Sequence, residues 1–203
     1  MSAVQKGAPV KDSAYFLARF LLENARKFMW IGGVNAIGCD VSSGRGTVCT
    51  LRVYDSRYAI AGHPEYIHSH SYGFHSRVVA GVMAEQRFVK VDDSDPRGEI
   101  YRSRRFGTDY KPIGGVENIL LRGAPVIEHP AGEEYCIGQG ELHRAFPLDG
   151  TVTVIRRNFG EITAPSIIAW RAEAADQDYS TKAEPVNPAI LADIVLNSLA
   201  TWF

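Results

Sequence analysis

The pattern of apolar and polar positions divides the chain into three segments. Between residues 12 and 31 the apolar residues recur at spacings of three and four, which predicts one amphipathic helix over this range. Asp12 or Ser13 is suited to cap its first turn. From about residue 45 to 172 the pattern changes to many short β-prone runs, most of them bounded by Gly, Pro, Asp or Asn. Short strands at frequent turn signals predict a sandwich or barrel.

Helical spacing returns near the end of the chain. Residues 187–202 form the third segment, with Asn187 as a predicted cap and Pro188 at the first helical position. We therefore predict an all-β fold with flanking helices, organised as a single domain over residues 1–203.

Composition narrows the possible partners. Apolar residues make up 45% of the 203 residues, charged residues 22%, and the formal net charge is −1. This balance gives no electrostatic reason to expect nucleic acid or an anionic membrane surface as a partner. The chain contains no stretch long enough to span a bilayer, and its first residues lack the apolar run of a secretory signal. With three widely spaced cysteines, this predicts a cytoplasmic protein.

The stretch from Tyr66 to His75 concentrates the candidate chemistry, because it holds three of the six histidines. On a β-strand the side-chain period is two, so His68 and His70 would leave the same face. Two imidazoles on one face can bind a single transition metal. A metal centre is therefore the first functional hypothesis.

A second motif supports this hypothesis. Gly138 and Gly140 allow a tight turn before a strand that would carry His143. The pair of motifs, His68-x-His70 with a later glycine and Gly-x-Gly-x-x-His143, resembles the cupin superfamily. This resemblance covers roughly residues 48–157 and implies a jelly-roll barrel. The long separation of the motifs implies an insertion between them.

The sequence departs from the common cupin pattern at one informative position. His75 stands where most metal-binding cupins have a glutamate ligand, so it is predicted either as a fourth ligand or as an imidazole that contacts the substrate. A centre built from neutral imidazoles leaves a divalent cation its full charge, which favours anionic, chelating substrates. Fe(II) is the predicted metal, with Mn, Ni and Zn as alternatives.

Among cupins, the histidine pattern most resembles the thiol dioxygenases, whose third ligand also lies in a Leu-His-Arg tripeptide. The resemblance implies His68, His70 and His143 as iron ligands. Those enzymes carry a catalytic tyrosine on a strand after the third ligand, and residues 156–160 contain none. Thiol oxidation is therefore one option among several for an oxygenase.

Other side chains are candidates for substrate contacts. Arg52 and Arg77 lie on predicted strands, where an inward arginine would bind a substrate carboxylate and an outward one would be solvated. Tyr72 could donate a hydrogen bond to bound oxygen or substrate. His63 and His129 each precede a proline and are predicted to lie on the surface.

The leading functional prediction is a mononuclear Fe(II) oxygenase that acts with O2 on a small organic acid, amino acid or thiol. The first alternative is a redox-neutral isomerase or lyase that uses Zn or Mn, and the second is a non-catalytic metal- or ligand-binding protein. Exposed sheet edges predict a homodimer.

Overall fold

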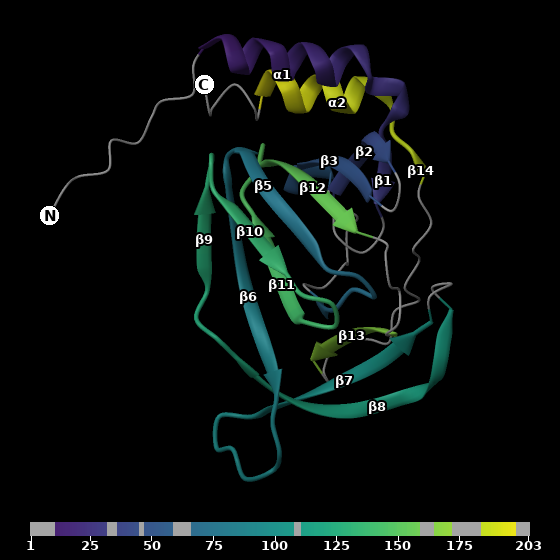
Figure 1. The fold of residues 1–203 in the computed structure, drawn as a ribbon, viewed down its shortest axis with the longest axis vertical. Helices are drawn as coiled ribbons and strands as arrows, with labels where there is room; N and C mark the ends of the chain where they lie inside the picture. The colour runs from purple at the N-terminus through teal and green to yellow at the C-terminus, as the bar shows by residue number, and fades with distance from the viewer. Residues whose placement is uncertain are drawn as a thin grey trace, which may run out of the picture.

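The computed structural model describes residues 11–31, 36–44, 47–58, 66–107, 111–158, 165–171 and 184–197. Helices α1 (Lys11–Glu23) and α2 (Pro188–Asn197) lie side by side at one end, and strands make up the body of the molecule (Figure 1). The first strands in the chain are β1 (Met29–Ile31), β2 (Ala36–Gly44), β3 (Thr47–Tyr54), β4 (Ile67–His68), β5 (Phe74–Ala80), β6 (Val82–Lys90) and β7 (Glu99–Phe106). They are followed by β8 (Pro112–Gly123), β9 (Ile127–Pro130), β10 (Glu134–Ile137), β11 (Leu142–Pro147), β12 (Val152–Asn158), β13 (Ser166–Arg171) and β14 (Glu184–Pro185).

Eight of these strands form a jelly roll. One sheet runs in the order β10-β5-β12-β3, and the other in the order β4-β11-β6-β9, with antiparallel pairing throughout. This is the two-sheet arrangement that the cupin resemblance implies, so the predicted all-β jelly roll with flanking helices is confirmed. Strands β2, β1 and β14 extend the first sheet beyond β3, which makes the β-structure start before residue 45.

An insertion is predicted between the two motifs, and the structure has strands β7 and β8 there. They pair with each other and join β13 and β6. Because β13 pairs with β4, β4 with β11 and β11 with β6, the strands β4, β13, β7, β8, β6 and β11 close into a ring. We call this ring the accessory barrel.

Each strand of the accessory barrel contributes an apolar side chain to one cluster inside the ring. The buried members of this cluster are Ile67, Phe88, Tyr101, Leu121, Leu142 and Ala169. Strands β4 and β11 therefore belong to both barrels. The side chains on one face of each strand point into the accessory barrel, and those on the other face point into the jelly roll. The accessory barrel lies at the end opposite the helices (Figure 1).

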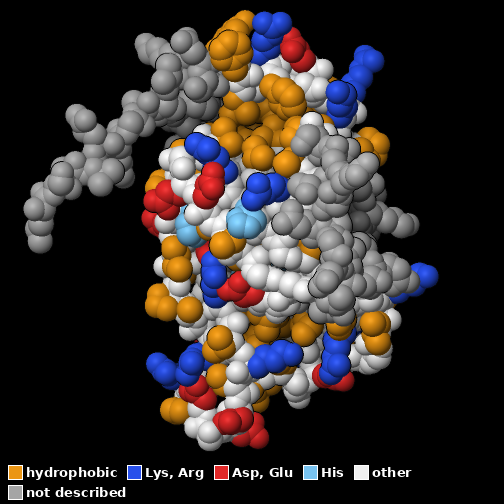
Figure 2. Space-filling view, viewed as in Figure 1, with side chains coloured by type: hydrophobic (Ala, Val, Ile, Leu, Met, Phe, Trp, Pro, Cys, Tyr) orange, Lys and Arg blue, Asp and Glu red, His pale blue; other side chains and the backbone are white. Residues whose placement is uncertain are grey.

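The helices cover the outer face of the first sheet. Leu21 of α1 and Ile194 of α2 are fully buried in one cluster with Leu51 and Val53 of β3. Burying an aliphatic side chain of this size stabilises the fold by roughly 1.5–3 kcal/mol. Because Leu51 and Val53 face the helices, the alternate positions of β3 face the jelly-roll interior. Figure 2 shows hydrophobic side chains gathered at the helical end, with charges of both signs interspersed elsewhere on that face.

The first helix is shorter than predicted. It ends at Glu23, and Asn24 follows with its side-chain amide donating to the Phe20 carbonyl at 2.8 Å. The run Met29–Ile31, predicted as helix, is strand β1 and pairs with β2 and β14. In this run, backbone pairing with neighbouring strands overrides the helical periodicity of the sequence. The predicted cap residues, 12 and 13, lie inside α1.

The second helix starts where the sequence predicts. Asn187 Oδ1 accepts a hydrogen bond from the Ala189 backbone N–H at 3.0 Å, which is the geometry of a helix N-cap. The helix is described as far as Asn197, and the remainder of the predicted range lies outside the described residues. In the part of the chain that the structure describes, no helix is both long and apolar enough to cross a membrane.

Candidate metal centre

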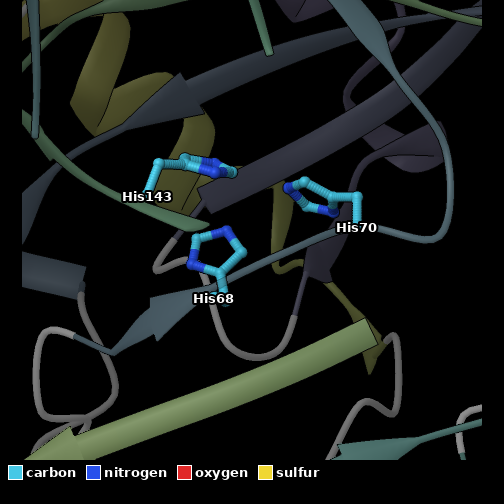
Figure 3. A group of neighbouring side chains, drawn as sticks. All are labelled: His68, His70 and His143. Carbon is cyan, nitrogen blue, oxygen red and sulfur yellow. The ribbon is translucent and has the colours of Figure 1, made fainter. Parts of the chain in front are cut away.

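Three histidines converge inside the jelly roll. His143 on β11 lies directly opposite His68 at the end of β4, and His70 follows two residues later in the chain. Directly opposed residues of an antiparallel pair project to the same face. The ring centroid of His68 is 4.4 Å from that of His143 and 4.9 Å from that of His70 (Figure 3). One ligand nitrogen from each of the three rings lies within 4.8 Å of the others.

Backbone carbonyls orient two of these rings. His68 Nδ1 lies 3.3 Å from the Tyr66 carbonyl oxygen, and His143 Nδ1 lies 3.2 Å from the Glu141 carbonyl oxygen. A carbonyl only accepts hydrogen bonds, so this arrangement assigns the proton to Nδ1 and leaves the Nε2 lone pair available. Metal-binding histidines are commonly held by the same kind of hydrogen bond.

The interior keeps the three imidazoles neutral. Burial, together with the neighbouring His143, lowers the pKa of His68 to about 3. Burial also lowers the pKa of His143 to about 4, and it lowers the pKa of His70 well below the usual value. Neutral imidazoles are the form that coordinates metals, so the group needs no deprotonation near pH 7.

These donors fit a first-row transition metal. The cluster contains three imidazole nitrogens and, within the described residues, no carboxylate. Imidazole suits Fe, Ni, Cu and Zn, whereas Mg and Ca require oxygen ligands. A three-histidine set leaves positions open for other ligands. The close approach of the nitrogens and the carbonyl-oriented rings therefore match what such an ion requires.

Arg52 and Tyr72 lie beside the histidines, so Arg52 takes the inward one of its two predicted orientations. Arg52 on β3 is 8% exposed, and its Nε has no hydrogen-bond partner among the described residues. Its positive charge contributes to lowering the pKa of all three histidines. The Tyr72 ring is buried and stacks on His70 with a centroid distance of 5.2 Å. A cationic and a hydroxyl-bearing side chain thus accompany the imidazoles.

His75 and Arg77 are not brought to the cluster. On β5, the side chains of Phe74, Ser76, Val78 and Ala80 are buried, whereas His75, Arg77 and Val79 are exposed. The prediction that His75 and Arg77 share a face is correct, but that face points out of the barrel. Arg77 pairs there with Glu134 at 3.5 Å. The predicted roles of His75 as a fourth ligand and of Arg77 as an inward clamp are therefore wrong.

The structure also reveals a buried polar group that the sequence analysis missed. Glu85 on β6 is 1% exposed, and its Oε1 lies 3.4 Å from Nε2 of His129. The His129 ring stacks on Tyr135 at 4.5 Å, with an angle of 13° between the ring planes. The prediction of a surface position for His129 is wrong, because β9 pairs with β6 and carries this ring into the interior. His63 lies outside the described residues.

Arg157 on β12 also lies beside Tyr72. Its guanidinium lies 5.8 Å from the Tyr72 ring centroid, and its Nη2 donates to Thr50 Oγ1 at 2.9 Å. Tyr72, which the sequence suggested as a hydrogen-bond donor at the site, comes from the segment between β4 and β5.

Comparisons with known proteins give limited similarity. No model of a known protein family matches the chain, and no curated protein is significantly similar to it in sequence. Among solved structures, one similar protein is hydroquinone 1,2-dioxygenase from Sphingomonas sp. TTNP3 with 4-hydroxybenzoate bound. It is 14% identical in sequence, and the match has a TM-score of 0.36 and covers 63% of this chain and 68% of that chain. A cadmium complex of a hydroquinone 1,2-dioxygenase with 4-hydroxybenzonitrile is 10% identical, with a TM-score of 0.38 over 80% of this chain and 84% of that one.

The chain spans a smaller part of two other similar structures. Hydroxypropylphosphonic acid epoxidase from S. wedmorenis is 11% identical, with a TM-score of 0.32 over 62% of this chain and 51% of that one. Lactobacillus farciminis oxalate decarboxylase, as a formate complex, is 10% identical, with a TM-score of 0.34 over 66% of this chain and 31% of that one.

Proposed function

We propose that the protein is a mononuclear metal-dependent oxygenase that holds Fe(II) through His68, His70 and His143. The observation that carries this proposal is the convergence of three neutral imidazoles, two of them oriented through Nδ1 by backbone carbonyls. A ferrous ion bound there would supply sites for O2 and for a chelating substrate, and would activate both.

The surrounding side chains favour an anionic substrate. Arg52 is buried beside the cluster with an unpartnered Nε, and burying such a charge is costly unless an anion pairs with it. A carboxylate of an organic acid, an amino acid or a thiol-bearing acid would accept hydrogen bonds from this guanidinium. Tyr72 lies within the same interior and could hold or donate a proton at its hydroxyl oxygen. Arg52 thus orients the substrate, and Tyr72 supplies a polar contact near the reacting atoms.

A redox-neutral isomerase or lyase that uses Zn or Mn is the second candidate. The observation in its favour is that the same three-imidazole set, without a carboxylate, also serves zinc as a Lewis acid. A non-catalytic metal-binding protein would share the cluster but would have no need of a buried arginine whose Nε is left without a hydrogen-bond partner.

The test combines metal analysis with oxygen uptake. We expect iron-loaded wild-type protein to consume O2 with at least one member of a panel of small acids, amino acids and thiols. His68→Ala/His143→Ala should lose most of its bound metal, because one remaining imidazole cannot hold the ion. His75→Ala is the matched control, and it should keep the wild-type metal content because its side chain is exposed on the outer face.

Two outcomes would overturn parts of this proposal. Undiminished metal in the double variant would remove the site assignment. Turnover with Zn or Mn in the absence of O2 would replace the oxygenase by the lyase or isomerase.

We further propose that the chain is a cytoplasmic homodimer. All three cysteines are free thiols in the structure, which fits a reducing compartment. Light scattering during size-exclusion chromatography would determine the oligomeric state, and a monomer mass would contradict the dimer.

A further inference from the structure

A buried carboxylate lies close to the histidine cluster without belonging to it. On the paired strands β11 and β6, His143 lies opposite Arg87, and Ala145 lies opposite Glu85. Opposed residues of such a pair project to the same face, and so do residues two positions apart on one strand. Glu85, which is 1% exposed, is therefore a diagonal neighbour of His143 on the interior face. Diagonal neighbours in a sheet are about 7–8 Å apart.

The two carboxylate oxygens of Glu85 have different surroundings. Oε1 accepts hydrogen bonds from Nε and Nη2 of Arg87, at 3.1 and 2.9 Å. Arg87 also donates to Glu141 Oε1 at 2.7 Å and to the Cys136 carbonyl at 2.9 Å, so its guanidinium is held from several sides. Oε2 of Glu85 is buried and has no hydrogen-bond partner among the described residues. This oxygen therefore remains available to a proton or to a proton donor.

His129 lies between Glu85 and the protein surface. Its Nε2 is 3.4 Å from Glu85 Oε1, and its Nδ1 is 3.6 Å from Oε2 of Glu133. The Glu133 side chain is 54% exposed, whereas that of His129 is 11% exposed. The three side chains thus form a series from the interior to the solvent, with one imidazole nitrogen near each carboxylate. A neutral imidazole accepts a proton at one nitrogen and donates one from the other, so this ring can pass a proton between the two acids.

Neighbouring groups hold the members of this series in place. The His129 ring stacks on the ring of Tyr135, and burial raises the pKa of Tyr135 to about 13, so this phenol keeps its proton. The backbone N–H of Glu133 donates to the Pro130 carbonyl at 3.1 Å. The Glu133 carbonyl accepts from the Val78 N–H at 2.9 Å, which ties the turn after β9 to β5.

The two distances between imidazole and carboxylate are somewhat longer than a hydrogen bond. N–H···O bonds typically have donor–acceptor distances of about 2.7–3.2 Å. Contacts of this kind commonly shorten when a ligand binds in a catalytic site. A shift of a few tenths of an ångström, roughly, closes each gap.

We propose that Glu85, His129 and Glu133 form a proton path between the metal centre and the solvent. The proposal rests on the proposed metal centre, because a chelating substrate loses a proton from an O–H or S–H group when that oxygen or sulfur binds a metal ion. The bond to hydrogen breaks, the electron pair stays on the oxygen or sulfur, and the proton goes to Oε2 of Glu85. This step needs no oxidant or reductant.

The proton then leaves by way of His129. Protonation removes the negative charge that pairs with Arg87, and the terminal torsion of a glutamate turns readily, so the carboxyl group brings the proton to His129 Nε2. Nδ1 of the ring releases its own proton to Glu133, which exchanges protons with water. The reverse sequence returns a proton to the product as it leaves the metal, and it restores the starting tautomer of His129.

Stopped-flow mixing of Co(II)-loaded protein with acetohydroxamic acid tests this path. The probe is a small chelator that loses one proton when it binds a metal ion. The visible absorption of Co(II) reports its binding, and an indicator dye in weakly buffered solution reports the proton release. We expect the two signals to change together in the wild-type protein. Glu85→Gln and His129→Gln should each slow the proton release at least tenfold, since a positioned proton acceptor contributes about 10²–10⁴-fold to a rate.

Two exposed residues supply matched control variants. Glu134 pairs with Arg77 on the outside of the molecule, and His75 is exposed on β5. Glu134→Gln and His75→Gln should therefore release the proton at the wild-type rate. A wild-type rate in both Glu85→Gln and His129→Gln, or an equal slowing in the controls, would overturn the path. Equal Co(II) content and an unchanged Co(II) spectrum show that the metal centre is intact in each variant.

The measurement separates this path from the proposed oxygenase, because no O2 is consumed in it. Slowed proton release in Glu85→Gln and His129→Gln supports the path whether or not any substrate consumes O2. An absorption spectrum that does not change with acetohydroxamic acid would overturn the metal centre itself, and the path with it.

Discussion

Arg52 shows how the environment of a side chain decides which role can be proposed for it. Its side chain is 8% exposed and lies in the interior that also holds the three imidazoles. Its Nε has no hydrogen-bond partner among the described residues. Arg77, with the same side chain, is exposed and pairs with Glu134. Only the first arginine is placed to bind a substrate anion.

The two arginines therefore make a matched pair of variants. We expect Arg52→Met to raise KM for an anionic substrate about ten- to hundredfold, because a charge-assisted hydrogen bond contributes about 1.5–3 kcal/mol. Arg77→Gln should leave KM unchanged. Steady-state kinetics with parallel metal analysis checks this, since metal content should stay at the wild-type level in both proteins. An unchanged KM in Arg52→Met would exclude substrate binding by this residue.

At the scale of elements, the turn between β5 and β6 depends on a glycine. Gly81 has a φ of 78°, and a Cβ there would lie 2.6 Å from Thr151 Oγ1 and 2.8 Å from Thr151 Cα. Thr151 cannot easily withdraw, because its hydroxyl donates to the Val82 carbonyl at 2.9 Å. The later glycine of the first motif thus allows the turn between β5 and β6 to pack closely against Thr151, the residue before β12.

Two glycine-to-alanine variants distinguish the cost of the contact with Thr151 from the cost of a positive φ alone. Gly81→Ala should lower the free energy of unfolding by more than about 2 kcal/mol, because it adds a clash with backbone to the strain of a positive φ. Gly114→Ala is the control, with a φ of 73° and no atom within 4 Å of its Cβ. It should cost about 1 kcal/mol. Equal losses for the two variants in urea denaturation would show that the Thr151 contact is unimportant.

For the whole molecule, the buried imidazoles connect stability to pH. The folded-state pKa of His143 is about 4, and its usual unfolded value is about 6.5, so the unfolded chain binds more protons between these limits. The contribution of this histidine to stability is present above pH 6.5 and is lost as the pH falls toward 4.

We therefore expect metal-free protein to lose about 2 kcal/mol of stability per buried imidazole between pH 7.5 and pH 5. Urea denaturation of chelated protein at the two pH values measures this loss. His143→Gln should reduce the pH dependence, whereas His75→Gln, which changes an exposed side chain, should not. A stability that is independent of pH in this range would contradict the neutral, buried state of the cluster.

Sequence pattern alone determined much of the fold. The short β-prone runs predicted the barrel, Asn187 predicted the start of α2, and the resemblance of the two glycine-histidine motifs to cupins implied His68, His70 and His143. These features depend on local chemistry: strand period, capping and turn conformation are properties of neighbouring residues. The end of α1 was missed because Met29–Ile31 gains its partners from β2 and β14, which no local pattern reports.

Tertiary structure decided which side of each strand is inside. The alternation on β5 correctly grouped His75 with Arg77, yet only packing against the rest of the barrel turned that face outward. Likewise, the pairing of His68 with His143 and the closure of the accessory barrel join residues far apart in the chain. A side-chain period of two determines which residues of a strand share a face. Which of the two faces is buried depends on how the strand packs against the rest of the folded chain. For that reason the sequence suggested the three imidazoles, and only the fold showed that they meet.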